Sequence, residues 1–497
     1  MFREYLEKKD KLWMLTPPVY RKILPAKSFA VYTKIRDAIK LGKRIYVHPD
    51  PDIDGFLSAK CWDYCFKRLG YTNYSIGILK KRIHTVKAST IQEQIDNGAS
   101  VIIIVDSSSN EMEMINEVCS NEGVQLIIVD HHPTMNKFSQ YPDNCEIVNP
   151  KIEGEDSVLY PASAGVVNSL VCDYILYNHG ITDTSELEVY GYVTMYSDVC
   201  KPDNPYLSAY MHSKLHNKKC VPEFLNLFWD KYSSMNSRFI GFKINPIVNA
   251  NIRLGNFELI DKYFFKLEGL SETEKESIRD ELINERARAG TLVAELESIM
   301  ALQETEQLVI CMLPNDLDQI YYNFMGYIAN RAATKYNKPA ISVYLDEVTN
   351  CYIGSARDPY SRDLLAEFSA FFEGSEGHQS AFGVSINKRQ LKNLPAILQR
   401  AELGEESKDM IFDYMSLSSD KEILNMAIYN EFAIGNTPNV KVKVPITRSF
   451  NITGSSKKII ARTKTLTIVS FGTPIIWDTE VICTPQFNGT NVECVVN

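Results

Sequence analysis

Eight acidic and imidazole side chains follow four short apolar segments of the chain, and together they could hold metal ions. They are His48, Asp52, Asp54, Asp106, Asp130, His131, His132 and Asp198. An aspartate after a strand is often only a helix cap, and an isolated histidine is often a hydrogen-bonded polar residue. Because parallel strands deliver their carboxyl ends to one edge of a sheet, four such segments predict one shared site.

The charge of this set indicates divalent cations. Four aspartates gathered at one sheet edge would repel one another unless cations neutralised them. Two divalent ions would balance Asp52, Asp54, Asp106 and Asp198 charge for charge. Hard carboxylates with a minority of imidazoles favour Mn²⁺ or Mg²⁺, whereas a zinc site more often shows cysteines or a majority of histidines.

Strands and helices must alternate to position these groups. Continuous apolar runs at residues 44–47, 101–105 and 126–129 are typical of strands buried on both faces, and helical segments separate them. This order predicts a parallel, doubly wound α/β sheet. A fourth segment, residues 192–196, ends at Ser197-Asp198.

The remaining sequence predicts further units. Residues 271–302 keep helical spacing over a length that could bridge two domains, and a second α/β unit begins near residue 308. Short strands with Gly and Pro turns follow residue 439. We therefore expect five parts: an N-terminal helical segment (1–40), an α/β domain that carries the acid and histidine set (41–220), a helical connector (221–305), a second α/β domain (306–400), and a linker with a C-terminal β domain (401–497).

Composition bounds the class of protein. The 497 residues are 45% hydrophobic and 23% charged, and no apolar run is long enough to span a bilayer. Eleven cysteines without a Cys-x-x-Cys pair predict reduced thiols in the cytoplasm. The net charge of −9 argues against coating nucleic acid by bulk charge, but residues 441–464 contain seven basic residues and no acid.

The acid and histidine set resembles the motifs of the DHH phosphoesterases. The matching segments are His48-x-x-x-Asp52-x-Asp54-Gly55, Val105-Asp106, Val129-Asp130-His131-His132-Pro133 and Ser197-Asp198. The resemblance implies one metal on His48, Asp52 and Asp106, and another on Asp54, Asp106, His131 and Asp198. It also implies that His132 faces the scissile phosphate, while Asp130 orients the histidines.

The second half of the chain resembles RecJ-type exonucleases and their DHH-associated domain. The similar segments are residues 245–255, 326–331, 354–357 and 377–383. They imply five substrate-binding residues: Asn249, Arg253, Arg331, Arg357 and His378. Each arginine could instead be a surface or ion-paired residue.

Three positions depart from the family pattern. Asp106 is followed by Ser107-Ser108-Ser109 rather than Asn-Gly, and Glu376 precedes Gly377-His378 where a glycine is usual. Arg357 is followed by Asp358 rather than a serine. These departures concern the substrate contacts more than the metal ligands.

The resemblance implies a two-metal phosphodiesterase that removes nucleotides from the 5′ end of single-stranded DNA, with Mn²⁺ preferred and Mg²⁺ possible. DNA is favoured over RNA as the partner, no membrane is involved, and the polarity comes from the resemblance alone. The alternatives are a phosphodiesterase for short oligonucleotides or cyclic dinucleotides, and an inactive nucleic-acid-binding protein. The basic stretch, with Phe450, Phe471 and Trp477 nearby, could bind a single strand or merely protect a sheet edge.

Overall fold

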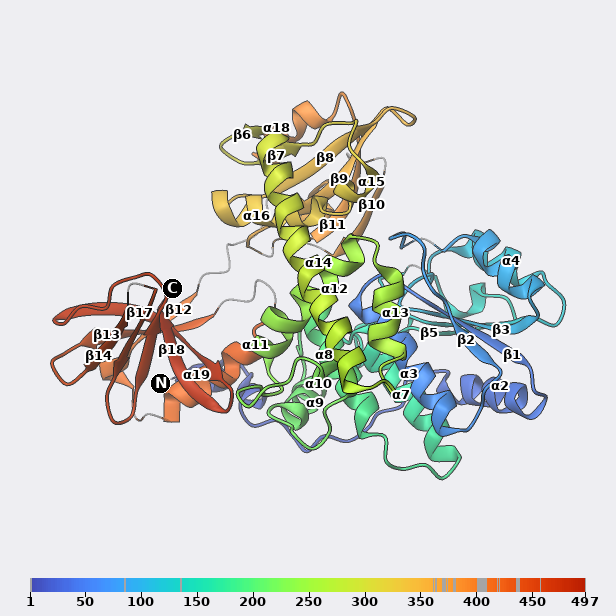
Figure 1. Cartoon of the computed structure of the whole chain (residues 1–497), viewed down its shortest axis with the longest axis horizontal. Helices are drawn as coiled ribbons and strands as arrows, with labels where there is room; N and C mark the ends of the chain where they lie inside the picture. The colour runs from blue at the N-terminus through green and yellow to red at the C-terminus, as the bar shows by residue number, and fades with distance from the viewer. Residues whose placement is uncertain are drawn as a thin grey trace.

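The chain forms three β-sheets, each with its own helices. The computed structural model describes residues 2–496 except 85, 135, 361, 363, 369–371, 373, 379, 380, 400–408, 418, 420, 435–438 and 456. The side chains of 366, 367, 375, 376 and 378 are also left undescribed. Figure 1 shows the first sheet at the right, the second above it and the third at the left.

The first sheet has five parallel strands in the order β2-β1-β3-β4-β5. The strands are β1 (Arg44–Pro49), β2 (Tyr74–Ile76), β3 (Ala99–Val105), β4 (Gln125–Val129) and β5 (Cys145–Val148). Helices cover both faces. On one face lie α2 (Ser28–Lys40), α3 (Ile53–Arg68), α7 (Ala164–Asn178) and α8 (Ser185–Ser197); on the other lie α4 (Ala88–Asp96) and α5 (Met112–Cys119).

The side chains of β3 alternate between the two faces of the sheet, which explains why its sequence is a continuous apolar run. Val101, Ile103 and Val105 belong to the core under α3 and α7, whereas Ile102 and Ile104 belong to the core under α4 and α5. Side chains alternate across a strand, so burial of both faces requires every position to be apolar.

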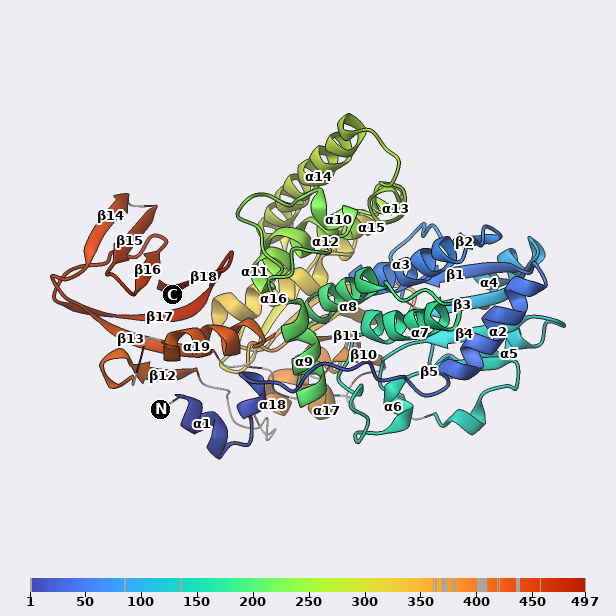
Figure 2. The same cartoon turned by 90° about the horizontal axis from the view of Figure 1, so that it is seen from below.

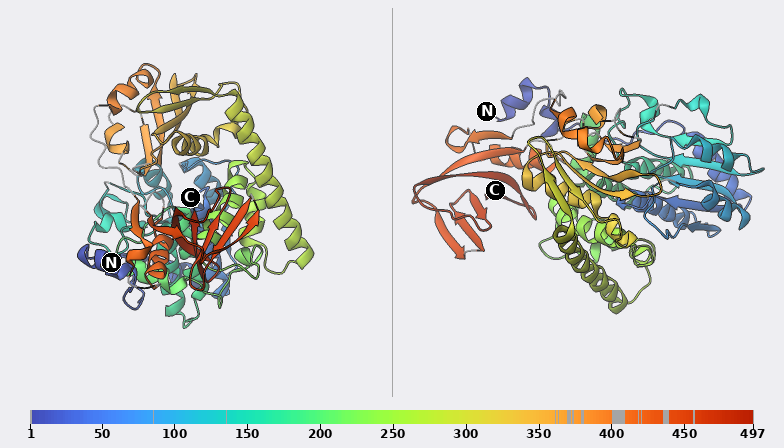
Figure 3. Two further views of the ribbon diagram at one scale, coloured as in Figure 1. Left: turned by 90° about the vertical axis from the view of Figure 1, so that its left-hand side faces the viewer. Right: turned by 90° about the horizontal axis from the view of Figure 1, so that it is seen from above.

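Short helices and one long helix lead from this sheet to the second. They are α6 (Pro150–Glu153), α9 (Pro205–Lys214), α10 (Glu223–Asn226), α11 (Ser237–Phe239), the π-helical turn η3 (Ile240–Ile244), α12 (Asn245–Arg253), α13 (Phe257–Phe265) and α14 (Glu272–Ile299). The 28 residues of α14 span about 42 Å. Ile278 and Leu282 of α14 pack in the first core, and Val293 and Leu296 pack in the second. The helix therefore bridges the two units (Figure 3).

The second sheet has six strands in the order β10-β11-β9-β8-β7-β6. Its strands are β6 (Ala301–Glu304), β7 (Val309–Met312), β8 (Ala340–Asp346), β9 (Cys351–Arg357), β10 (Gly374–His378) and β11 (Ala381–Asn387). Its helices are α15 (Gln319–Tyr322), α16 (Met325–Tyr336), α17 (Leu364–Phe368), η5 (Leu391–Asn393) and α18 (Leu394–Leu398). Only the β7–β8 pair is parallel among these described strands.

The third sheet has seven strands in the order β12-β13-β17-β18-β16-β15-β14. Its elements are β12 (Met410–Asp413), η6 (Tyr414–Ser416), α19 (Lys421–Glu431), β13 (Val440–Ile446), β14 (Asn451–Ser455), β15 (Lys458–Arg462), β16 (Thr467–Ser470), β17 (Thr479–Asn488) and β18 (Asn491–Val496). The N-terminal elements α1 (Phe2–Lys8) and η1 (Leu12–Met14) join it: Phe2 is buried against Phe412 and Tyr429 (Figure 2).

The expected fold class is confirmed: a parallel α/β sheet is joined by a long helix to a smaller α/β unit and a C-terminal β unit. Two details differ. The segment 192–196 lies in helix α8, and the long helix ends at Ile299, so that residues 301–302 belong to β6. No helix in the described part of the chain is long and apolar enough to cross a membrane.

Candidate metal centre and phosphate site

Backbone geometry explains how the first motif reaches the sheet edge. Asp52 follows β1 and caps α3, because its Oδ1 accepts the Gly55 N–H at 2.9 Å. A Cβ on Gly55 would lie 2.5 Å from the Asp50 carbonyl oxygen, so only glycine allows this close approach. The tight turn places Asp50, Asp52 and Asp54 together at the end of β1.

Asp54 and Asp106 are the most deeply placed carboxylates. Asp54 accepts the N–H groups of Ala164 and Gly165 at 2.9 and 2.7 Å, which anchors it to the start of α7. Both are at most 2% exposed. Burial, reinforced by the charge of neighbouring aspartates, raises the pKa of each carboxyl group well above its ordinary value. Such crowding of acids is costly unless cations neutralise it.

The histidines have opposite environments. His131 is buried, and its Nδ1 donates to the Ala162 carbonyl at 3.0 Å, which directs Nε2 toward Asp106 and Asp198 at 3.4 Å each. His132 pairs through Nδ1 with Asp130 at 2.8 Å. Burial would lower the pKa of His132, but the Asp130 carboxylate raises it to about 10, so the ring is charged at neutral pH.

Asp130 orients this pair. It is fully buried and accepts the N–H groups of Ser109, His131 and His132 besides the His132 ring. His48 is also buried, and burial lowers its pKa to about 4. Its Nδ1 lies 3.1 Å from the Tyr46 hydroxyl, and the tautomer in which Nδ1–H donates to that oxygen leaves the Nε2 lone pair for a metal.

The residues present fit divalent cations. The ligand atoms of Asp50, Asp52 and Asp106 lie within 4.8 Å of one another, as do those of His131, Asp198 and Cys200. Buried Oδ1 atoms of Asp50 and Asp106 have no hydrogen-bond partner among the described residues. Carboxylate oxygens with few imidazoles suit Mn²⁺ or Mg²⁺. Asp106 lies next to both Asp52 and His131, as a bridging ligand would.

Three residues around the centre have backbone φ values that favour glycine. Asp106, Ser108 and Val199 have φ of 64°, 75° and 58°. For a β-branched residue such as Val199 this conformation is an outlier, and each such residue costs about 1–3 kcal/mol. Ser108 stands where the family pattern has glycine. The chain therefore holds strain at the ends of β3 and α8, next to Asp106 and Asp198.

Three guanidinium groups gather beside the metal centre. Arg82 precedes α4, Arg253 ends α12 and Arg357 ends β9. Burial and the charges of Arg82 and Arg357 lower the pKa of Arg253 to about 9; burial and Arg82 lower that of Arg357 to about 10. Gly326 makes room for this cluster, because a Cβ there would lie 2.6 Å from the Arg357 guanidinium. Cations that repel one another at a site favour an anionic ligand.

The other predicted substrate residues are placed differently. Asn249 lies one turn before Arg253 on α12, and its carbonyl oxygen accepts from that guanidinium at 3.2 Å. Arg331 does not join the cluster, since it forms an ion pair with Glu297 of α14 at 2.7 Å. The backbone of His378 lies in β10, and its side chain falls outside the described residues.

A groove of about 420 Å³ separates the first and third units. Val199, Phe242, Lys441 and Gln486 are among the residues that line it. Val199 directly follows the predicted metal ligand Asp198 in the chain. Phe242 is 77% exposed. The groove therefore offers an exposed aromatic side chain on the way to the third sheet, whereas its Lys441 is paired with Asp409.

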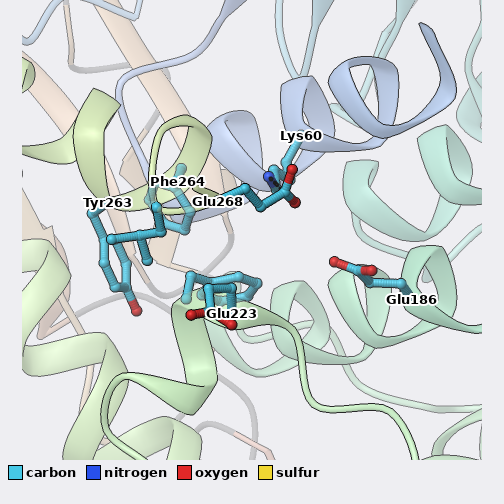
Figure 4. Close-up of a pocket in the computed structure, with 8 residues that line it drawn as sticks. Lys60, Glu186, Glu223, Tyr263, Phe264 and Glu268 are labelled. Carbon is cyan, nitrogen blue, oxygen red and sulfur yellow. Dashed lines mark ion pairs between the residues drawn. The ribbon is translucent and has the colours of Figure 1, made fainter. Parts of the chain in front are cut away.

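A second cavity is not a ligand site. It lies among α3, α8, α10 and α13, and Figure 4 shows Lys60 and Glu268 at one side of it. Its volume of about 10 Å³ admits about one water. Lys60 lies 4.0 Å from Glu268, and 3.4 Å from Asp63. Lys60 and Asp63 are buried and Glu268 is exposed, so these groups form an ion-pair network at the protein surface.

Sequence reasoning missed several residues near the centre. Asp50 is not among the eight predicted residues, yet it pairs with His84 at 2.6 Å and lies beside Asp106. Arg82 and Cys200 were not singled out. The basic segment Lys80-Lys81-Arg82, which follows a βα unit of the predicted sheet, was the available signal for the arginine.

Glu431 fastens the third unit to the first and is expected to make stability depend on pH. Its carboxylate accepts from Ser237 N–H and Oγ and from the Tyr196 hydroxyl. Burial raises its pKa from 4.5 to about 7. This stability is fully present below pH 4.5 and is lost as the pH rises through about 7, a change of up to about 3 kcal/mol.

Glu431→Gln keeps the acceptor and removes the titration. The free energy of unfolding is measured in urea from pH 5 to 8 for both proteins. As the pH rises, the value for wild type should fall relative to the value for this variant. Parallel curves for the two proteins would contradict the assignment.

Comparison with known proteins shows what the first domain and the whole chain are similar to. Residues 44–192 match the profile of the DHH family, N-terminal domain. YorK, an SPbeta prophage-derived protein of Bacillus subtilis strain 168 provisionally named a single-strand DNA-specific exonuclease, is 25% identical over 428 residues, which cover 79% of this chain and 70% of YorK. The single-stranded-DNA-specific exonuclease RecJ of the same organism is 22% identical over 373 residues, which cover 73% of this chain and 46% of RecJ.

Solved structures show the same fold. RecJ from Thermus thermophilus in complex with Mn²⁺ superposes with a TM-score of 0.70 at 18% identity, over 97% of this chain and 72% of that one. An exonuclease RecJ bound to manganese gives 0.57 at 18% identity, over 78% and 97%. Residues 44–192 therefore carry a DHH family, N-terminal domain, and the chain is similar in sequence to exonucleases of the RecJ type and shares the RecJ fold.

Proposed function

We propose that the protein is a metal-dependent exonuclease that hydrolyses single-stranded DNA from its 5′ end. The observation that carries this proposal is the pairing of an acid and histidine centre with a cluster of three arginines beside it, for which the described residues show no ion pair. The curated relatives YorK and RecJ are named as exonucleases of single-stranded DNA, and the fold neighbours include RecJ with Mn²⁺ and with Mg²⁺.

The metal ligands follow from the donor set. His48, Asp52 and Asp106 would hold one divalent ion, and Asp54, Asp106, His131 and Asp198 would hold the other, with Mn²⁺ preferred. Bound ions of this kind activate a water and neutralise charge on a phosphodiester. Asp50 adds a carboxylate to the first group, and its bond to His84 fixes its orientation.

His132 would stabilise charge on the scissile phosphate. Its Nδ1–H is held by Asp130, and its raised pKa keeps the second ring proton on Nε2 at neutral pH. An imidazolium N–H donated to a phosphate oxygen is a charge-assisted hydrogen bond, which strengthens as negative charge develops. The 38% exposure of the His132 side chain leaves it open to the substrate.

The arginine cluster would fix where the strand is cut. Arg82, Arg253 and Arg357 can each donate two parallel hydrogen bonds to a phosphate. A strand end held there lies beside the metal centre, so hydrolysis would release nucleotides from that end. The second domain takes part directly, because β9 supplies Arg357.

The groove favours a polymer over a dinucleotide. A phosphodiesterase for short oligonucleotides or cyclic dinucleotides would need only the first two units. Here a groove lined by Val199, the residue after Asp198, extends to the third sheet, with the aromatic side chain of Phe242 available for stacking on bases. An inactive binding protein is disfavoured, because each predicted metal ligand is present.

One assay tests the proposal. The full chain is incubated with Mn²⁺ and single strands labelled at either end, beside a linear dinucleotide and a cyclic dinucleotide. Immediate loss of the 5′ label with an inert dinucleotide is the expected result. Cleavage restricted to dinucleotides would replace the proposal with the alternative, and loss of the 3′ label first would reverse the polarity.

The third unit is expected to bind the strand through the β14–β15 hairpin. Ion pairs with Asp409, Glu480 and Asp478 neutralise Lys441, Lys443 and Arg448. The other four basic residues of the stretch, Lys457, Lys458, Arg462 and Lys464, lie on or beside the hairpin, and all four are exposed. Lys458 also packs over the exposed ring of Phe471.

Reversing Lys458 and Arg462 to glutamate should weaken single-strand binding. If each contacts one phosphate, the slope of log affinity against log salt should fall by about 1.4. Binding is measured by fluorescence anisotropy at several salt concentrations. Lys262→Glu, an exposed change on α13, is the control. An unchanged slope in the double variant would exclude this surface.

A further inference from the structure

The thiol of Cys200 lies against the metal centre, although the proposed hydrolysis does not require it. Its Sγ is 3.1 Å from Asp198 Oδ2, and that same oxygen is 3.4 Å from His131 Nε2. The ligand atoms of these three residues lie within 4.8 Å of one another. The thiol therefore occupies the side of the centre formed by α8 and His131.

The backbone turns back to place the thiol there. Helix α8 ends at Ser197 with Asp198 as its C-cap, and the Cys200 N–H donates to the Met195 carbonyl at 2.9 Å. This return requires Val199 to adopt a φ of 58°. A branched side chain seldom takes this conformation. An ordinary extended Val199 would direct the chain, and the thiol with it, away from Asp198.

The possible metal ligands around His131 and Cys200 differ in type from the carboxylates of Asp50 and Asp52 on the other side of the centre. Imidazole nitrogen, carboxylate oxygen and sulfur stand together, and Asp106 Oδ1 lies 3.4 Å from His131 Nε2, buried without a hydrogen-bond partner among the described residues. Four donors of mixed type are what a tetrahedral zinc site uses. Mn²⁺ and Mg²⁺ prefer oxygen, whereas a thiolate prefers thiophilic ions.

We propose that Cys200 makes this half of the centre a His-Asp-Cys site for a thiophilic divalent cation, Zn²⁺ or Cd²⁺, which competes with Mn²⁺. As the sulfur–metal bond forms, the thiol proton passes to solvent, and no electron is transferred. The inference rests on the metal centre of the proposed function. A buried cysteine that only packs is the alternative.

Cadmium titration of the metal-free full chain tests the site without reference to hydrolysis. Wild type should show the ultraviolet sulfur-to-cadmium charge-transfer band at the first equivalent, and so should Cys220→Ser, a control at a partly exposed cysteine away from the centre. Cys200→Ser and Cys200→Ala should lose that band and bind Cd²⁺ at least about tenfold more weakly. A full band and unchanged affinity in both Cys200 variants would overturn the proposal.

X-ray absorption at the zinc edge gives a readout on wild type alone. One sulfur neighbour at about 2.3 Å in the stoichiometric zinc complex supports the site, and a shell of nitrogen and oxygen only overturns it. Zn²⁺ should also inhibit Mn²⁺-supported hydrolysis more strongly in wild type than in Cys200→Ser. If hydrolysis is absent while the cadmium band follows Cys200, the proposed function fails and this inference stands. If hydrolysis proceeds and the band is absent, only this inference fails.

Discussion

Asp106→Asn is expected to abolish hydrolysis while leaving the metal-free protein folded and at least as stable as wild type. Asp106 belongs to the acid group of the first motif and also faces His131, so both halves of the centre lose a ligand. The rate should fall at least about a thousandfold, equivalent to about 4 kcal/mol. Asparagine is chosen because it tolerates the positive φ of 64° at this position better than alanine.

The expected gain in stability has an electrostatic cause. Burial raises the pKa of Asp106, and the charges of Asp54, Asp52, Asp50 and Asp198 raise it further. Without cations, an amide at this position relieves that repulsion, which should raise the free energy of unfolding by about 1–2 kcal/mol. Urea unfolding in the presence of a chelator measures this change.

Metal addition then separates the variant from wild type. Mn²⁺ should stabilise wild type, because it binds the folded state, and should have little effect on Asp106→Asn. Asp280→Asn, an exposed change on α14, should match wild type in activity and in its response to Mn²⁺. A folded Asp106→Asn enzyme with full activity would contradict the assignment of the centre.

The parallel sheet and the aspartates at its edge could be predicted from the sequence, because each aspartate directly follows an apolar segment of the chain. Asp54 and Asp106 could be placed because a parallel sheet gathers strand ends at one edge. What could not be predicted depended on distant partners. Arg331 sits in a segment similar to a substrate-binding one, yet Glu297, on another helix, neutralises it. Only the folded chain brings these two residues together.

The C-terminal unit shows the same limit more clearly. Its short strands were expected from turn residues, but its core includes Phe2, more than 400 residues earlier in the chain. Residues 441–464 are also less positive in the folded protein than their sequence indicates. Asp409 and Glu480, which lie outside this segment, pair with Lys441 and Lys443. Local composition describes charge along the chain, whereas binding depends on charge in space.

Replacing any one of the three clustered arginines by alanine is expected to raise KM about 10- to 100-fold. Each guanidinium would lose charge-assisted hydrogen bonds to a substrate phosphate worth about 1.5–3 kcal/mol. Because Arg82, Arg253 and Arg357 would share one phosphate, their effects should not add, and a double variant should lose less than the sum. Arg253→Lys should recover only part of the affinity, since an ammonium group cannot form the paired contact.

Strands that end in a 5′-phosphate, a 5′-hydroxyl or a 3′-phosphate show which end the cluster holds. If the cluster sets the polarity, the variants should lose the preference for a 5′-phosphate over a 5′-hydroxyl. Their activity on strands with a 5′-hydroxyl or a 3′-phosphate should stay unchanged. Arg288→Ala, which removes an exposed arginine paired with Glu285 on α14, is the matched control.

Stability without substrate gives an independent check on the same cluster. Mutual repulsion and burial lower the pKa of Arg253 and Arg357, so removing Arg82 should raise the melting temperature of the free protein slightly. Inorganic phosphate should stabilise wild type more than Arg82→Ala, because an anion between the guanidinium groups offsets their repulsion. If phosphate stabilised both proteins equally, the cluster would not be an anion site, and the position of the cut would have to be set by the groove instead.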